Sequence, residues 1–436
     1  MAMDCTQRKI LQEKFLQQVG VLPVAVLGNG VTAKGIRSLL EKLDLRSTLY
    51  DQNPQKGENF DGEKIRQHNV IIGSPSFLSH HPWVRLVKKS QKHYWSELDF
   101  ASLWCGVPIV AVTGTNGKTT VTSFLCEIFN HFGRRAFTAG NIGRSLSELV
   151  ATETLNREDI VFCETSSFQG ENLEIFVPER LIWTNFAPNH LDHHRGLEDY
   201  FRAKYRLVQR LWVGHECCDD RLFCGKSVAF WAKRFRLKMP EETHYLAPKS
   251  SPTGTSFDDF PQRENYAIVE DFCRCYGIPE NVVLGEAEHF RRPRYRLEPM
   301  GMVGGNGYWN DSKCTNFAAL KGALSNFSKN VIWIGGGRFK GEKLEDLVPI
   351  LKGKVRQAIL IGETGMELEK ILLRQKISAV YVKTIENGIR HIKNTCFSGE
   401  NIVFSPAFPS FDQFSNFEER GKFFEKCIFD LKFLHF

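Results

Sequence analysis

Short apolar runs alternate with amphipathic stretches along most of the chain, a pattern typical of parallel strands joined by helical crossovers. In the first part, residues 23–27 predict a buried strand, residues 32–43 a helix and residues 48–50 the next strand. The turn Gly28-Asn29-Gly30 joins the first strand to the helix, as in half of a nucleotide-binding βαβ unit. A further strand is predicted at residues 69–73.

The same alternation restarts twice. A buried strand at residues 108–113 leads through glycines into a helix that begins near Lys118, and strands at 159–164 and 180–185 follow. Helical periodicity returns at 196–212 and 262–276, whereas residues 213–261 show no readable pattern. Beyond Ala287 the sequence predicts strands at 330–334, 358–361 and 401–404, and an amphipathic terminal helix.

These restarts predict an α/β protein with three Rossmann-like domains. The chain has 436 residues, which suits about three domains of roughly 150 residues each. We place the domains at residues 1–106, 107–286 and 287–436. The central domain carries Gly114-Thr115-Asn116-Gly117-Lys118-Thr119 directly after its first predicted strand, so it is expected to be of the P-loop ATPase type, with a mostly parallel sheet.

Composition excludes several protein classes. With 42% hydrophobic and 25% charged residues, the chain is neither disordered nor fibrous, and no apolar run reaches the roughly 18 to 20 residues that span a bilayer. A net charge of +7 without a basic tail favours small anionic substrates over nucleic acid. The 12 scattered cysteines and the polar amino terminus lead us to expect reduced thiols and a cytoplasmic location.

The most specific motif is Val112-Thr113-Gly114-Thr115-Asn116-Gly117-Lys118-Thr119-Thr120, between a predicted strand and a predicted helix. Its two glycines let backbone N–H groups face phosphate oxygens, and the helix amino terminus adds partial positive charge. Lys118 would neutralise the terminal phosphates of ATP, and the Thr119 hydroxyl would bind Mg²⁺. Val112 stands where the general pattern has glycine, so an ordinary strand-turn-helix remains the alternative.

Further motifs follow this loop. In chain order they are Gly140-Asn141-Ile142-Gly143, Glu164-Thr165-Ser166-Ser167-Phe168-Gln169, Asn189-His190-Leu191-Asp192, Ala203-Lys204 and Asn310-Asp311-Ser312-Lys313. Together with the phosphate loop they resemble the Mur ligase family of ATP-dependent amide-bond-forming enzymes. The segment Ser405-Pro406-Ala407-Phe408-Pro409-Ser410-Phe411-Asp412-Gln413-Phe414, with Asn416-Phe417-Glu418 and Arg420-Gly421, is similar to the D-glutamate-adding branch of that family.

The resemblance implies a reaction of peptidoglycan synthesis. ATP would activate the carboxylate of UDP-N-acetylmuramoyl-L-alanine as an acyl phosphate, and the amine of D-glutamate would then attack, with release of ADP and phosphate. Because both steps bring anions together, the site requires Mg²⁺ and cationic side chains. We therefore expect ATP and Mg²⁺ as cofactors, these two substrates as partners, and neither nucleic acid nor a membrane. The sequence does not decide the oligomeric state, and a monomer is our expectation.

The resemblance also assigns residues to the ATP chemistry. It implies catalytic roles for Lys118, Glu164, His190 and Lys204, and metal ligation by Thr119, Glu164, His190 and, once carbamylated, Lys204. Without the resemblance, Lys204 would be a solvated residue on a helix, and the histidines at 190–194 leave a zinc cluster open. The implied ATP contacts are Gly114, Thr115, Asn116, Gly117, Lys118, Thr119, Thr120, Asn265, Arg296 and Asp311.

Two further substrate sites are implied in the same way. For the UDP-sugar the matching residues are Asn29, Val31, Thr32, Asp51, Ser74, Asn141, Ser166 and Gln169. For D-glutamate they are Lys313, Thr315, Lys340, Ser410 and Phe417. The loop at 335–341 is one residue longer than usual, so Arg338 is an alternative to Lys340, and periodicity alone makes Phe417 a core aromatic.

Other functions remain open at this point. A sister ligase of the family would add a different amino acid to a muramoyl nucleotide. A P-loop ATPase or kinase would transfer phosphate without forming an amide. A binding protein without catalysis is disfavoured because Lys118, Glu164, His190 and Lys204 occur together.

Overall fold

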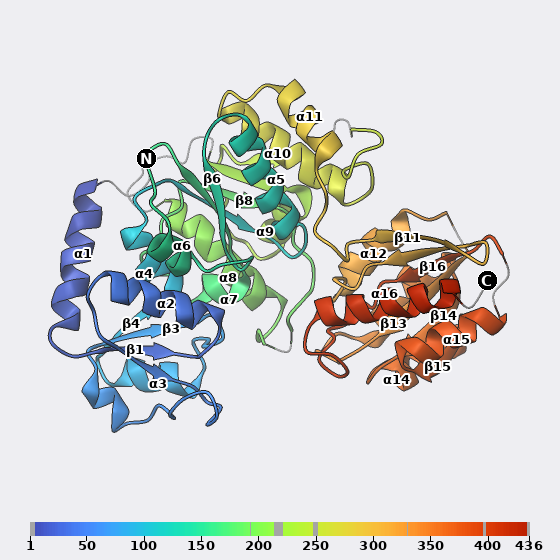
Figure 1. Ribbon diagram of the computed structural model, residues 1–436, viewed down its shortest axis with the longest axis horizontal. Helices are drawn as coiled ribbons and strands as arrows, with labels where there is room; N and C mark the ends of the chain where they lie inside the picture. The colour runs from blue at the N-terminus through green and yellow to red at the C-terminus, as the bar shows by residue number, and fades with distance from the viewer. Residues whose placement is uncertain are drawn as a thin grey trace. The chain divides into compact units, whose positions relative to one another are not determined.

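The computed structural model describes residues 5–191, 193–212, 221–246, 252–328, 330–395 and 398–433 (Figure 1). They form three separate β-sheets with helical connections, so the predicted α/β class is confirmed. By internal contacts the chain divides into two compact units. Unit 1 comprises Met1–Phe186, Glu198–Thr255 and Arg263–Phe290, and unit 2 comprises Ala187–Leu197, Ser256–Gln262 and Arg291–Phe436.

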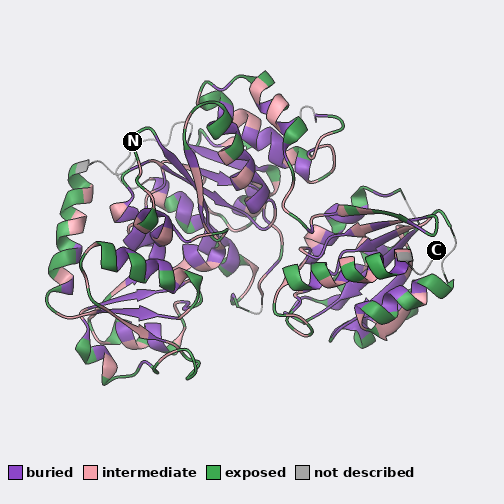
Figure 2. Ribbon diagram, in the orientation of Figure 1, coloured by how far each residue is buried: buried purple, intermediate pink, exposed green. Residues whose placement is uncertain are grey.

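The N-terminal sheet of unit 1 has the strand order β2-β1-β3-β4, with all described pairings parallel. Its apolar strands are buried beneath helices, as Figure 2 shows by the purple strands. The elements of this part are α1 (Cys5–Val19), β1 (Val24–Leu27), α2 (Val31–Lys42), β2 (Ser47–Tyr50), η1 (Lys64–Gln67), β3 (Val70–Gly73), α3 (Pro82–Lys89), β4 (His93–Ser96) and α4 (Glu97–Trp104).

The central sheet, also in unit 1, has the order β10-β9-β8-β5-β7-β6, again with parallel pairings. Its elements are β5 (Ile109–Thr113), α5 (Lys118–His131), β6 (Ala136–Gly140), α6 (Leu146–Thr152), β7 (Ile160–Glu164), α7 (Ser167–Glu171), β8 (Arg180–Trp183), α8 (Leu197–Leu211), β9 (Leu222–Gly225), α9 (Lys226–Arg234), β10 (His244–Leu246), α10 (Gln262–Cys275) and α11 (Glu280–His289).

Two buried carboxylates connect these sheets within unit 1. Asp99, on α4, accepts hydrogen bonds from the backbone N–H groups of Glu174, Ile175 and Phe176, at distances down to 2.7 Å. Glu97 accepts one from the N–H of Ser147 on α6 at 2.7 Å. Burial raises the pKa of both carboxyl groups. Hydrogen bonds between side-chain carboxylates and backbone N–H groups thus join α4, which follows the N-terminal sheet, to segments around the central sheet.

The C-terminal sheet lies in unit 2 and has the order β11-β12-β16-β13-β14-β15, in which the described pairings are parallel except for β11 with β12. Its elements are β11 (Glu298–Val303), β12 (Asn306–Asn310), α12 (Phe317–Ser325), β13 (Val331–Gly336), η2 (Leu344–Leu347), α13 (Val348–Leu351), β14 (Val355–Ile361), α14 (Gly365–Arg374), β15 (Ser378–Lys383), α15 (Ile385–Thr395), β16 (Asn401–Phe404) and α16 (Phe417–Phe433).

Helices cover both faces of the C-terminal sheet. Leu320 of α12 and Leu368 of α14 join the core on one face, and Ile389 of α15 and Ile428 of α16 join the core on the other (Figure 1). This three-layer arrangement explains why the sheet strands read as nearly continuous apolar runs, since both of their faces are buried.

Residues 213–261, which show no readable periodicity, contain regular structure where they are described. They hold the strand β9, the helix α9 and the three-residue strand β10, while residues 213–220 and 247–251 lie outside the described residues. The predicted strand 180–185 ends at Trp183, because Thr184 and Asn185 turn to bond the phosphate loop. The other predicted strands and helices are confirmed, with bounds that shift by up to three residues.

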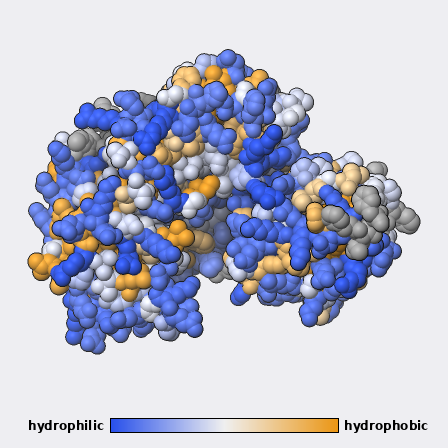
Figure 3. All heavy atoms as spheres, in the orientation of Figure 1, coloured by the Kyte–Doolittle hydropathy of each residue, from blue (hydrophilic) through white to orange (hydrophobic). Residues whose placement is uncertain are grey.

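On the face drawn in Figure 3, hydrophilic residues predominate and apolar residues form scattered patches. Among the described residues, no helix combines the length and the apolar character needed to cross a bilayer.

Candidate active site

The phosphate loop lies between β5 and α5, at the carboxyl edge of the central sheet. Gly114 and Gly117 have φ values of +146° and +83°, in the region that favours glycine. A Cβ atom on Gly117 would lie only 2.4 Å from Oδ1 of Asn265 on α10. Glycine is therefore needed both for the turn and for the approach of Asn265, which belongs to the predicted ATP set.

Residues at the end of β8 hold the loop in place. The Thr184 hydroxyl donates to the carbonyl of Asn116 at 2.6 Å, and the Asn116 N–H donates to Asn185 Oδ1 at 2.9 Å. The Thr115 N–H donates to the Asn185 carbonyl at 3.0 Å. The sequence interpretation missed Thr184 and Asn185, although two polar residues directly after a buried strand beside β5 are a usable signal.

Lys118 begins α5 and folds back over the loop. Its ammonium group donates to the carbonyls of Gly114 at 3.0 Å and Thr115 at 3.1 Å. The neighbouring Thr119 and Thr120 side chains are buried against the sheet. A half-buried cation beside backbone N–H groups at a helix start is suited to bind a polyphosphate.

Glu164 ends β7, next to β5, and is buried. Its Oε2 accepts a hydrogen bond from the Thr119 hydroxyl at 2.7 Å, and its Oε1 accepts one from Asn141 Nδ2 at 3.0 Å. The structure thus brings Glu164 and Thr119 together as predicted for metal ligands. It also places Asn141, predicted for the UDP-sugar, directly on this carboxylate.

Lys204 lies on α8 but is fully buried, unlike the solvated lysine that its helix alone would predict. Its Nζ donates to the Gly114 carbonyl at 2.9 Å and lies 3.4 Å from the Thr113 hydroxyl. Burial lowers the pKa of Lys204 well below its ordinary value, the positive charge of Lys118 lowers it further, and Glu164 opposes the shift. The environment therefore favours a neutral amine beside the phosphate loop.

His190 belongs to unit 2, whereas Thr119, Glu164 and Lys204 belong to unit 1. It has a φ of +55°, and its N–H donates to Asn189 Oδ1 at 3.0 Å. Within the described ranges, no three His, Cys, Asp or Glu side chains are grouped to hold a metal ion, so His190, His193 and His194 form no zinc cluster there.

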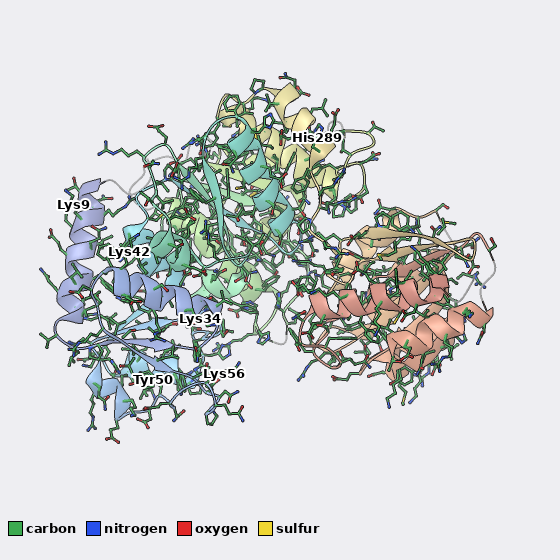
Figure 4. The ribbon with its side chains drawn as sticks, viewed as in Figure 1. Lys9, Lys34, Lys42, Tyr50, Lys56 and His289 are labelled. Carbon is green, nitrogen blue, oxygen red and sulfur yellow. The ribbon has the colours of Figure 1, made fainter. Side chains whose placement is uncertain are left out.

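Five of the predicted UDP-sugar residues lie at the carboxyl edge of the N-terminal sheet, namely Asn29, Val31, Thr32, Asp51 and Ser74. After β2, Asp51 Oδ2 accepts from the Asn29 N–H at 2.7 Å, and Asn29 Nδ2 donates to the Lys56 carbonyl at 2.5 Å. Ser74, after β3, donates to the Leu27 carbonyl at 2.8 Å. Val31 and Thr32 begin α2, the helix that also carries Lys34. Lys34 and the loop residue Lys56 lie in the same part of the molecule (Figure 4).

Ser166 and Gln169 have a local structural role as well. The Ser166 hydroxyl accepts from the Gln169 N–H at 3.2 Å, and Gln169 Oε1 accepts from the Ser166 N–H at 2.9 Å, so they form the capping box of α7. Gln169 and Ser74 line one small pocket within unit 1. The pocket thus brings together two members of the predicted UDP-sugar set, Ser74 from the N-terminal sheet region and Gln169 from the central sheet region.

The predicted amino-acid residues lie at one edge of the C-terminal sheet. The strands β12, β16 and β13 are adjacent and parallel, so the loops after them meet at their carboxyl ends. Lys313 and Thr315 follow β12, Ser410 follows β16, and Lys340 follows β13. The Lys313 ammonium lies 4.4 Å from the ring centre of Phe417, the first residue of α16. Phe417 is half-buried and lies beside the Lys313 ammonium group.

Lys340 and Arg338, the two alternatives for contact with D-glutamate, have different surroundings in the structure. Arg338 is exposed, whereas Lys340 is buried. The Lys340 ammonium donates to the Thr315 carbonyl at 2.5 Å and to Asn189 Oδ1, and lies 3.4 Å from Glu342 Oε1. Lys340 is thus held beside Thr315, another member of the predicted set.

Asp311 and Arg296 lie in unit 2. Asp311 Oδ1 accepts from the Leu297 N–H at 3.1 Å, and Oδ2 accepts from the Ser405 hydroxyl at 2.7 Å. Burial raises the pKa of Asp311 to about 7. Arg296 stands between Tyr295 and Leu297, which both have positive φ values. Asp311 therefore fixes the corner that carries Arg296. Ser405 belongs to the motif at residues 405–414, which predicted no individual role for it.

Comparisons with known proteins agree with this geometry. Residues 112–215 match the Mur ligase middle domain. The chain is 32% identical over 406 residues to a UDP-N-acetylmuramoylalanine–D-glutamate ligase of Desulfovibrio desulfuricans, a match that covers 92% of this chain and 89% of the relative.

Solved structures share the fold at low sequence identity. A pseudomurein peptide ligase type C from Methanothermus fervidus has a TM-score of 0.58 at 13% identity, covering 94% of this chain and 100% of that one. The MurF ligase of Thermotoga maritima, solved in complex with ADP, has a TM-score of 0.55 at 14% identity, covering 84% and 91%. With the sequence match over most of both chains, these findings lead to one conclusion: the chain belongs to the Mur ligase family and is an ATP-dependent, amide-bond-forming ligase.

Proposed function

We propose that the protein joins D-glutamate to UDP-N-acetylmuramoyl-L-alanine through an acyl-phosphate intermediate. The observation that carries the proposal is the cluster at the phosphate loop, where Glu164 contacts Thr119 and the buried amine of Lys204 contacts Gly114. The name of the Desulfovibrio relative supports the choice of substrates. In this reaction a carboxylate oxygen attacks the γ-phosphorus, ADP leaves, the amine displaces phosphate, and one proton is released.

Lys118 and the loop N–H groups would bind the phosphates of ATP and orient the γ-phosphoryl group. The Glu164 carboxylate and Thr119 hydroxyl are oxygen donors of the type that Mg²⁺ prefers, so the residues present fit that ion. When bound, Mg²⁺ would offset the negative charge of the phosphates. Asn265, which contacts the loop, would lie along the nucleotide.

Lys204 is proposed to act as a carbamate. A neutral amine can add to carbon dioxide, with formation of an N–C bond and loss of one proton, and burial favours the neutral form here. The product would replace a cation by an anionic oxygen donor near Thr119 and Glu164. Full activity of Lys204→Ala would contradict this role, as would a mass that shows the free amine in the active, Mg²⁺-bound enzyme.

D-glutamate would bind at the edge formed by β12, β16 and β13. Lys313 and Lys340 supply positive charge for its two carboxylates, and the Thr315 and Ser410 groups supply polar contacts. The UDP-sugar would bind at the edge where Asn29, Asp51 and Ser74 gather. Each ligand is thus proposed for the carboxyl end of a parallel sheet, where α/β proteins commonly bind ligands.

The test is an assay of phosphate release with ATP, Mg²⁺ and UDP-N-acetylmuramoyl-L-alanine. Addition of D-glutamate should start phosphate release, and mass spectrometry should detect the ligated product. L-glutamate, glycine, L-alanine and diaminopimelate serve as the other arms. Phosphate release that responds to another amino acid would indicate a sister ligase, and release that responds to none would exclude the ligase proposed here.

A further inference from the structure

Arg420 is a buried arginine that has no place in the site described so far. It lies in the first turn of α16 and is 2% exposed, which makes it one of the largest fully buried side chains among the described residues. Arginine is almost never buried without a charged partner. Yet in the described ranges no carboxylate lies within ion-pair distance of its guanidinium group.

The guanidinium group instead bonds neutral oxygen atoms of two loops. Its Nε donates to the Ser312 hydroxyl at 3.1 Å, and one terminal nitrogen donates to the Ser312 carbonyl at 2.7 Å. The other terminal nitrogen donates to the Phe408 carbonyl at 2.9 Å. The planar guanidinium group therefore links the loop after β12 to the loop after β16 by hydrogen bonds.

Those loops carry the proposed amino-acid site. Ser312 immediately precedes Lys313, and Phe408 lies two residues before Ser410. The Ser312 hydroxyl also donates to the Phe417 carbonyl at 2.9 Å, which ties the third segment of the site to the same point. One side chain thus sets the spacing of the backbone segments that bear Lys313, Ser410 and Phe417.

The charge of Arg420 fits an acidic substrate as well. Burial lowers its pKa to about 10, so the group stays protonated at neutral pH. Asp412 and Asp311 are near enough to favour that charge without bonding it. A buried cation whose bonded partners are neutral leaves a positive field at this edge of the sheet.

We propose that Arg420 is a positioning residue for the amino-acid substrate: its hydrogen bonds to Ser312 and Phe408 hold the loops of Lys313 and Ser410 at the spacing that a dicarboxylate requires. The inference rests on the proposed function for the identity of the amino acid. It assigns a role to a residue that touches neither ATP nor the UDP-sugar in our proposal.

The test compares Arg420→Lys, Ser312→Ala and Lys426→Met in steady-state kinetics. Arg420→Lys keeps the charge but cannot span both loops, and Ser312→Ala removes only the hydroxyl contacts. Lys426 is exposed on the same helix and serves as the control. We expect the KM for D-glutamate to rise about tenfold or more in Arg420→Lys and about threefold in Ser312→Ala, with the KM for the UDP-substrate unchanged.

The Ser312→Ala variant keeps the test valid if Arg420→Lys does not fold, since it removes only the two hydrogen bonds of the Ser312 hydroxyl and leaves the Ser312 carbonyl and Arg420 in place. A purely structural role would reduce the amount of active enzyme and leave each KM unchanged, and that result would overturn the proposal, as would equal changes in the KM of every substrate. If wild-type enzyme uses another amino acid, the proposed function fails, and the same KM comparison with that amino acid decides the role of Arg420.

Discussion

At the residue scale, the phosphate-loop site depends on a few side chains whose surroundings give them unusual properties. Lys118 and Lys204 lie on different helices, yet both donate to the Gly114 carbonyl. The two amines lie near the Glu164 carboxylate, so the protonation of Lys204 depends on its burial and on these neighbouring charges. Substitutions at single residues therefore test it most sharply.

Replacement of Lys118 by alanine should reduce ATP turnover roughly 100-fold or more, since it removes the cation nearest the phosphates. Turnover is measured as substrate-dependent release of phosphate. Lys226 is a matched control because it too begins a helix directly after a glycine, and it is exposed. Near-normal turnover in Lys118→Ala, or an equal loss in Lys226→Ala, would refute the assignment.

Lys204→Met should change the pH dependence of stability. Because the folded state lowers the pKa of Lys204, the wild type carries a penalty at neutral pH that declines as the pH rises toward the ordinary lysine value. In bicarbonate-free buffer the melting temperature of Lys204→Met relative to wild type should therefore be highest near about pH 7 and fall toward about pH 10. A difference independent of pH would contradict the buried, neutral amine.

The pKa of Asp311 shifts in the opposite direction to that of Lys204, because burial raises it. Its folded pKa of about 7 lies above the ordinary value of 3.8, so the folded state keeps a proton that the unfolded chain has lost. Stability against urea should fall as the pH rises from about 4 to about 7, and Asp311→Asn should flatten that fall. The exposed Asp430→Asn is the control. An unchanged slope in Asp311→Asn would show that this carboxyl is not responsible.

At the element scale, the strands that carry the site could be predicted because they are apolar runs bounded by glycine or polar turns. The strand that ends in Glu164 is an example, and the helix that starts at Lys118 could be predicted from the glycine turn before it. The strand β10 has only three residues, too few to show a period, so the region around it gave no pattern. Likewise, no periodicity on α8 could reveal that Lys204 faces the phosphate loop, since that contact joins residues 90 apart in the sequence.

Helix contacts in unit 1 offer an element-level test at Gly35 of α2. A Cβ atom there would lie 2.2 Å from Ser145 Oγ and 2.9 Å from the backbone nitrogen of Glu148, at the start of α6. Gly35→Ala should therefore destabilise unit 1 by about 1 to 3 kcal/mol, as overpacking does. Gly285→Ala on α11, where a Cβ meets nothing within 4 Å, should be neutral or stabilising. Equal unfolding midpoints for both variants would contradict this packing.

At the scale of the whole molecule, three sheets each present loops at the carboxyl ends of parallel strands. Most of the proposed UDP-sugar residues lie at the first sheet, the phosphate loop at the second and the proposed amino-acid residues at the third. The sequence could predict this repeated architecture, because each restart of apolar runs marks a new sheet. The domain limits at 106/107 and 286/287 stay predictions, as do the individual ligand contacts.

The central claim is that a carboxylate oxygen becomes part of the phosphate that leaves. The direct measurement uses UDP-N-acetylmuramoyl-L-alanine whose carboxylate is labelled with ¹⁸O. The enzyme is incubated with this substrate, ATP and D-glutamate, and mass spectrometry measures the ¹⁸O content of the released phosphate. The account predicts that the phosphate gains labelled oxygen from the substrate in step with amide formation. Amide formed with unlabelled phosphate would contradict it.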